Sequence, residues 1–195
     1  MEPVSLILDT DMDTDCDDAG ALALVHHAIK LGACRLCAVV CNVPYPEAAL
    51  CTHYLNRYYS HDDIPVGLAA IPDHEISPIY ADYRLLRSNI PENRRYNKLF
   101  ARLYSKDGAG SGFPEFHDST KIYRKTLSEC ADGSVVICAI GLLSALAGLL
   151  DSDPDEYSPL CGRDLVAAKV RLLVTMAVLE YDKDGKEEFN WRMDV

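Results

Sequence analysis

Short, nearly continuous apolar runs alternate with helical segments along most of this 195-residue sequence. Such runs are typical of strands in a parallel sheet whose two faces are both covered by helices. The pattern therefore predicts one α/β domain with a mostly parallel sheet and helices on both faces. Strands are expected at residues 4–8, 35–41, 64–69, 134–140 and 170–178, and helices at residues 19–31, 47–59, 119–130 and 141–150. The segment 72–118 is polar, aromatic and rich in turn residues.

The sequence is acidic, with a formal net charge of −11 and a pI near 4.9. Nucleic acids and anionic membranes recruit Lys and Arg, so neither is expected as a partner. No stretch approaches the roughly 18 apolar residues of a membrane span. The N-terminus also lacks the basic region of a secretory signal. Together these features predict a cytoplasmic protein.

Eight cysteines are present, and most lie inside apolar runs, where Cys behaves as a small hydrophobic residue. A reducing compartment is expected, so disulfides are not. The spacing of Cys34, Cys37 and Cys41 leaves a zinc site as an alternative. A tetrahedral zinc site would need further ligands, and the neighbouring sequence offers no second pair.

Six aspartates fall within ten positions, directly after the first predicted strand. Carboxylates this close repel one another, and each resists ionising beside its neighbours. Such crowding indicates that a cation lies among them. The six are Asp9, Asp11, Asp13, Asp15, Asp17 and Asp18.

Three other interpretations of the cluster compete with this one. Asp17 and Asp18 suit the start of a helix, but two acids would be enough for that purpose. An EF-hand loop needs Gly and Glu where this sequence has Thr14 and Gly20, so that motif fails. An aspartyl phosphatase of the DxD type would use Asp9 as its nucleophile, but it does not account for the later acids.

Polar residues also follow other predicted strands. Asn42 comes directly after the second strand, while Glu188 and Asn190 lie some way beyond the last. In open α/β sheets, ligands bind outside the carboxyl ends of the strands. The sequence therefore gathers its acids and amides where such a fold keeps its active site.

Four blocks of the sequence, in order, resemble the inosine–uridine-preferring nucleoside hydrolases. DTDMDTDCDDAGALAL is similar to the aspartate signature of that family, and LCAVVCN to its second strand, which ends in Asn. SVVICAIGLLSALAGLL resembles the family's strand–Gly–Leu–Ser/Thr–helix segment. RLLVTMAV, followed by GKEEFNWRMD, resembles its late strand and Glu-Phe-Asn motif.

The resemblance implies a Rossmann-like nucleoside hydrolase domain over residues 4–195 and Ca²⁺ as cofactor. The implied activity is hydrolysis of the N-glycosidic bond of a nucleoside to ribose and free base. Asp11 would be general base and calcium ligand, with Asp18 and the carbonyl of Ile140 as further ligands. The implied ribose contacts are Asp17, Asn42, Glu188 and Asn190. Asp9 and Asp15 are expected to shape the loop, and Asp13 to be solvated.

Departures from the family pattern lead to a second hypothesis. Asp13 stands where the family usually has Gly, and the family domain continues to a His-Asp pair beyond the Glu-Phe-Asn motif. The chain is therefore expected to be the N-terminal portion of such a domain, with its C-terminal part missing. It would then be a catalytically impaired relative that binds calcium or a nucleoside, or that serves as an assembly partner. Homo-oligomers are expected, because absent strands would leave an apolar edge.

Overall fold

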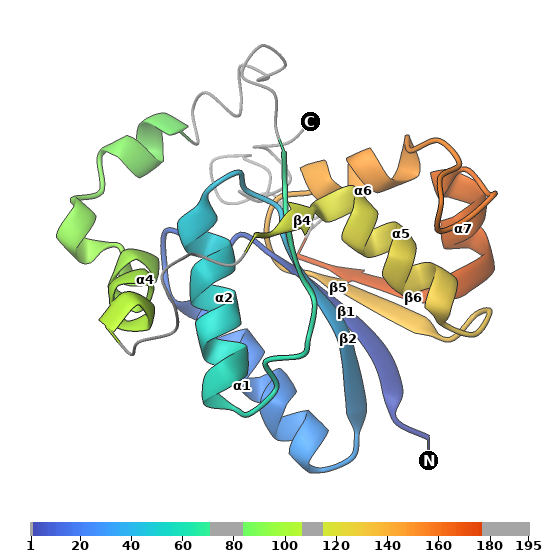
Figure 1. Ribbon diagram of the computed structural model, residues 1–195, viewed down its shortest axis with the longest axis horizontal. Helices are drawn as coiled ribbons and strands as arrows, with labels where there is room; N and C mark the ends of the chain where they lie inside the picture. Colours follow the sequence, from blue (N-terminus) through green and yellow to red (C-terminus); the bar gives the residue numbers. More distant parts are fainter. Residues whose placement is uncertain (1, 71–83, 107–114, 177–195) are drawn as a thin grey trace, which may run out of the picture.

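The computed structural model describes residues 2–70, 84–106 and 115–176, which form a parallel sheet with helices on both sides (Figure 1). The six strands lie in the order β4-β3-β2-β1-β5-β6, and every neighbouring pair is parallel. The bounds are β1 Val4–Thr10, β2 Cys34–Cys41, β3 Val66–Leu68, β4 His117–Asp118, β5 Val135–Ala139 and β6 Val170–Thr175.

Two groups of helices cover the two faces of this sheet (Figure 1). One face carries α1 (Asp17–Lys30) and α2 (Pro46–Tyr58), with α4 (Tyr96–Lys106) packed beside α2. The other carries α5 (Ser119–Glu129), α6 (Ser144–Leu150) and α7 (Gly162–Lys169). A 3₁₀ turn, η1 (Glu92–Arg94), precedes α4.

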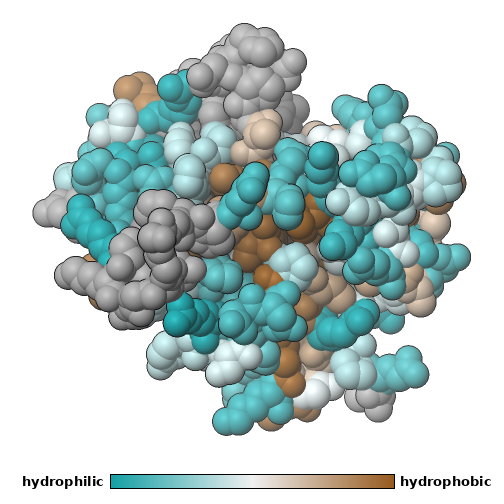
Figure 2. Space-filling model, viewed as in Figure 1, coloured by the Kyte–Doolittle hydropathy of each residue, from teal (hydrophilic) through white to brown (hydrophobic). Residues whose placement is uncertain are grey.

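A hydrophobic core lies on each side of the sheet, because successive side chains of a strand point to opposite faces. In β1, Leu8 packs with Leu22 of α1, whereas its neighbour Ile7 packs with Tyr123 and Leu127 of α5. Figure 2 shows hydrophobic residues in the strip between the two helical layers, whose outer surfaces are largely hydrophilic. A three-layer α/β sandwich follows from this alternation.

The predicted α/β fold is confirmed, and each expected strand and helix overlaps an observed one. Three of the labelled strands and α-helices were not predicted, and neither was η1. β4 has only two residues, and α4 lies within the segment that was described as turn-rich. The third, α7, is a short helix of eight residues.

The zinc alternative conflicts with the geometry of β2. Cys41 is part of the core under α1 and α2, whereas Cys37 packs against the core under α5. A single ion cannot bind thiols on opposite faces of a sheet.

The last described strand forms an edge of the sheet. Leu172, Leu173 and Val174 of β6 are each about half exposed, at 52%, 48% and 46%. Self-association through such an edge stays a prediction. None of the helices in the described ranges is both long and apolar enough to cross a membrane.

Candidate functional site

The ends of three adjacent strands bring the predicted site residues together. β1 continues into the aspartates, β2 ends one residue before Asn42, and β5 ends one residue before Ile140. Backbone hydrogen bonds extend the sheet to this level, since Asn42 N donates to the carbonyl of Thr10 over 2.9 Å and Ile140 N to that of Asp9 over 2.8 Å. The carboxyl ends of β1, β2 and β5 therefore meet at one edge.

Asp9 fixes the strand ends to one another. Its carboxylate is fully buried, and it accepts hydrogen bonds from Asn42 Nδ2 through Oδ1 and from Tyr123 Oη through Oδ2. These bonds tie β1 to β2 and to α5. A nucleophile needs an oxygen that can reach the substrate, so this burial argues against the phosphatase alternative, in which Asp9 attacks.

Asp11 and Asp18 form a buried pair of carboxyl groups, with 7% and 1% of each residue exposed. Their side chains are hydrogen-bonded to each other, and Thr10 Oγ1 donates to Asp18 Oδ1. Two carboxyl groups can share a hydrogen bond only if one of them carries a proton. Burial, followed by the charge of Asp18, raises the pKa of Asp11 to about 9. Burial also raises the pKa of Asp18.

Two exposed aspartates adjoin this pair at the start of α1. Carboxylate oxygens of Asp15, Asp17 and Asp18 lie within 4.8 Å of one another. Burial, together with Asp17, raises the pKa of Asp15 to about 6. Oxygens at this separation can share one calcium ion, because Ca–O distances are about 2.3–2.6 Å.

The donor set at this edge suits a hard cation. It consists of carboxylate, amide and carbonyl oxygens, which are the ligands that calcium prefers. Asn42 Oδ1 is buried and has no hydrogen-bond partner, so the site contains an oxygen that still requires one. The residues therefore fit a hard cation such as the calcium that the resemblance implies.

The expectation that Asp13 is solvated was wrong. Asp13 is fully buried, with its Oδ2 2.6 Å from Arg87 Nε and its Oδ1 2.8 Å from Asn97 Nδ2. Asn97 Nδ2 also donates to the carbonyl of Met12 over 3.1 Å. Within the aspartate loop, the residue with a left-handed backbone is Met12 (φ 46°). Asp13, which stands where the family usually has Gly, does not have a positive φ. Burial of the Met12 side chain and the hydrogen bond from Asn97 Nδ2 to the Met12 carbonyl stabilise this conformation.

Gly141 permits the close approach of β5 to the site. A Cβ atom at this position would lie 2.6 Å from Asp11 N and 2.7 Å from Asn42 Nδ2. Both neighbours are fixed, one in the backbone and the other by its bond to Asp9. Only glycine fits here without displacing a residue of the site.

The structure thus brings Asp11, Asp17, Asp18, Asn42 and Ile140 to one region. Glu188 and Asn190 lie outside the described residues. The sequence analysis missed the side chains that hold the aspartates in place, because each comes from a distant segment. They are Tyr123, Arg87 and Asn97.

Comparisons with known proteins agree with this fold. No family model matches the sequence, and no curated protein matches it either. The plant nucleoside hydrolase PpNRh1 has a TM-score of 0.59 and 19% identity, over 96% of this chain and 53% of its own. The type III effector protein XopQ, solved with adenosine diphosphate ribose, has a TM-score of 0.70 and 16% identity, over 98% of this chain and 51% of its own.

The chain has the nucleoside hydrolase fold. It spans about half the length of each of these two solved structures. At these identities the likeness shows the fold alone. The aspartates lie outside the carboxyl ends of the strands, where open α/β sheets bind their ligands.

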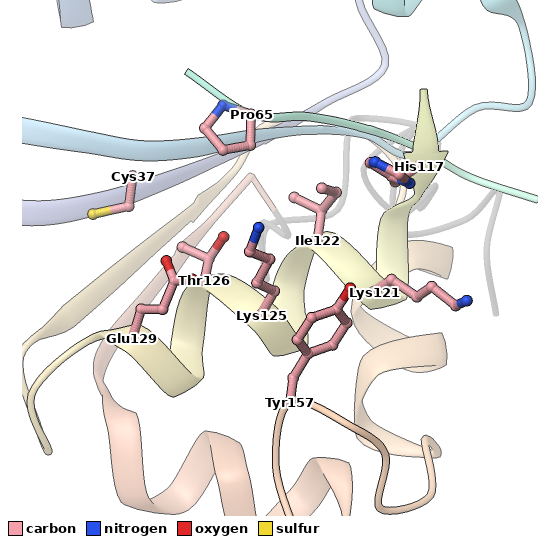
Figure 3. A pocket seen from close by; sticks show the side chains of 9 residues that line it. All are labelled: Cys37, Pro65, His117, Lys121, Ile122, Lys125, Thr126, Glu129 and Tyr157. Carbon is pink, nitrogen blue, oxygen red and sulfur yellow. The ribbon is translucent and has the colours of Figure 1, made fainter. Parts of the chain in front are cut away.

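A separate cavity of about 170 Å³ lies along α5, beside Cys37 and Tyr157 (Figure 3). Lys125 and Glu129 lie along its length, and the amine of Lys121 points away from both of them. Its volume is below the roughly 300 Å³ at which small-molecule sites begin. None of its lining residues is a predicted site residue, so the candidate functional site remains the aspartate cluster.

We predict that Gly141→Ala destabilises the fold by about 1–3 kcal/mol, because the new methyl group would displace Asp11 or Asn42. Gly20→Ala is the matched control. It lies in α1 with nothing within 4 Å of the new Cβ, so it should stabilise the protein by up to about 1 kcal/mol. Urea unfolding measures both changes. An unchanged midpoint for Gly141→Ala would contradict the close approach.

We predict that stability in calcium-free buffer falls as the pH rises from 7 to 9. The pKa of Asp11 is about 9 when folded, against an ordinary value of 3.8, so the folded state holds a proton that the unfolded state has released. The stabilisation is complete below the unfolded pKa and is lost as the pH rises through the folded one. The raised pKa of Asp18 acts in the same direction, whereas Asp15, with a pKa of about 6, contributes only below pH 7.

Asp11→Asn is the control for this pH dependence, since the amide can donate to Asp18 as the protonated acid does. Its melting temperature should change less between pH 7 and 9 than that of the wild type. Equal slopes for the two proteins would show that the Asp11 carboxyl does not titrate in this range.

Proposed function

We propose that this chain carries the catalytic aspartates of a calcium-dependent nucleoside hydrolase. The reaction would split the N-glycosidic bond of a ribonucleoside with water, giving ribose and free base. The buried Asp11–Asp18 pair at the carboxyl end of β1 is the observation that carries this proposal. The fold shared with a plant nucleoside hydrolase adds support.

Two buried carboxyl groups need a nearby positive charge before both of them can ionise. An isolated buried carboxylate is costly, and two of them together are more so. Bound among these oxygens, calcium would supply the charge that lets both acids ionise and would hold water and ribose hydroxyls nearby.

Asp11 would act as the general base. In its ionised form it would accept a proton from the water that attacks the anomeric carbon. Positive charge develops on the sugar as the bond to the base breaks, and the surrounding carboxylates stabilise it. Asp18 and the Ile140 carbonyl would be calcium ligands beside it.

Ribose would be held by hydrogen bonds at the strand ends. Asn42 Nδ2 is already committed to Asp9, so the contribution of Asn42 would come from Oδ1, which is buried and unpartnered. Asp17 is exposed at the start of α1, where it can accept from a hydroxyl. Glu188 and Asn190 remain proposed ribose contacts from the resemblance alone.

A second candidate is a catalytically impaired relative that binds a ribosyl compound without efficient turnover. XopQ is a protein of similar fold that was solved with adenosine diphosphate ribose, and it supports ribosyl binding as a use of this fold. The two candidates share the aspartate site and differ only in whether ribose is released.

We predict that millimolar calcium raises the melting temperature, because only the folded loop gathers the ligands. Ligand at 100 times its dissociation constant stabilises a protein by about 2.7 kcal/mol. Asp11→Asn and Asp18→Asn should each lose most of this shift. Differential scanning fluorimetry at fixed pH is sufficient to measure it.

Asp151→Asn is the matched control for charge, because Asp151 is exposed and pairs with Arg163 at the surface. It should keep the full calcium response. If calcium leaves the melting temperature of the wild-type protein unchanged, calcium has no part in the proposed function.

We predict that activity, where present, releases ribose from nucleosides and no phosphate from phosphomonoesters. Ribose release from a panel that includes inosine and uridine should stop on chelation and in Asp11→Asn. Ribosyl binding without release would favour the impaired relative. Phosphate release would overturn the glycosidase assignment.

A further inference from the structure

Residues 84–106, which we call the α4 arm, reach the aspartate loop from another part of the chain. The arm comprises a helical turn at 84–88, η1 and α4. Its Arg87 pairs with Asp13 over 2.6 Å and lies 3.5 Å from the ring centre of Tyr45. Its Asn97 holds the other oxygen of Asp13. The arm is therefore attached to the loop by two residues.

Three side chains of this arm end in buried polar atoms without a hydrogen-bond partner. They are Arg87 Nη2, Tyr96 Oη and Asn97 Oδ1. Buried polar groups normally have partners, and one without a partner lowers stability. Three such atoms on an arm that contacts Asp13 indicate that something outside the described chain supplies their partners.

The packing contacts of Tyr96 are made by its ring and not by its hydroxyl. Its ring packs edge-on to Phe100, with centroids 6.4 Å apart, and against the core under α1 and α2. Phenylalanine would make the same contacts without a buried hydroxyl. Burial raises the pKa of Tyr96, and the charges of Asp18 and Asp11 raise it further. The phenol is thus near the site and remains a hydrogen-bond donor at physiological pH.

We propose that Tyr96 binds the ligand of the aspartate site through its hydroxyl, with Arg87 and Asn97 as positioning residues. This inference rests on the proposed function and adds a binding residue that the resemblance does not assign. The ligand group is a sugar hydroxyl, which can accept from Tyr96 and donate to a carboxylate or amide oxygen. An anionic group fits less well, because the carboxylates of Asp11 and Asp18 adjoin the site.

Tyr96→Phe removes only the hydroxyl and tests the inference directly. Tyr58→Phe is the matched control, since Tyr58 is 73% exposed on α2. Melting temperatures are measured in chelator, in calcium, and in calcium with increasing D-ribose. Without ribose, Tyr96→Phe should melt at the wild-type temperature or above it, because an unpartnered buried hydroxyl has been removed. Its ribose dissociation constant should rise about 3- to 10-fold, the range expected for one lost hydrogen bond.

The outcomes separate this inference from the function on which it rests. An unchanged ribose response in Tyr96→Phe would show that the hydroxyl contacts water only and would overturn the inference alone. Loss of the calcium response as well would make Tyr96 a structural part of the loop and would also overturn it. A wild-type protein that responds to neither calcium nor ribose would overturn the proposed function together with the inference. Tyr58→Phe should match the wild type throughout.

Discussion

Repulsion between buried carboxylates at the end of β1 is the constraint on which the site depends. Different contacts accommodate each of these acids. Asp9 accepts hydrogen bonds from two neighbouring elements, and Asp13 forms an ion pair with Arg87. Asp11 and Asp18 are hydrogen-bonded to each other, and Thr10 donates to Asp18. We propose that a cation binds at this buried pair, where burial raises the pKa of both acids.

The fold followed from the sequence where local pattern and tertiary structure agree. The short apolar runs of β1, β2 and β5 are typical of strands in a parallel sheet that is covered on both faces. β4 has no such signal, since its two residues become a strand only by pairing with Gly67 and Leu68 of β3. α4 does carry a helical spacing of apolar residues, since Tyr96 and Phe100 lie one turn apart and pack against the core, but the polar, turn-rich segment around it obscured this signal.

The site could be predicted only in part, for a similar reason. Its acids are adjacent in the sequence, so their crowding was visible. The residues that set their environment are not adjacent, since Arg87 lies 74 positions from Asp13 and Tyr123 lies 114 from Asp9. Sequence reasoning therefore treated Asp13 as solvated, whereas the α4 arm buries it. Which acids are buried, and what each of them contacts, is a property of the folded chain.

A crystal structure determined in millimolar calcium tests the central claim most directly. We predict one calcium ion between the carboxylates of Asp11 and Asp18, with their mutual hydrogen bond broken. Calcium would take the place of the shared proton. A structure in which the two side chains remain hydrogen-bonded to each other, with no ion between them, would contradict the account.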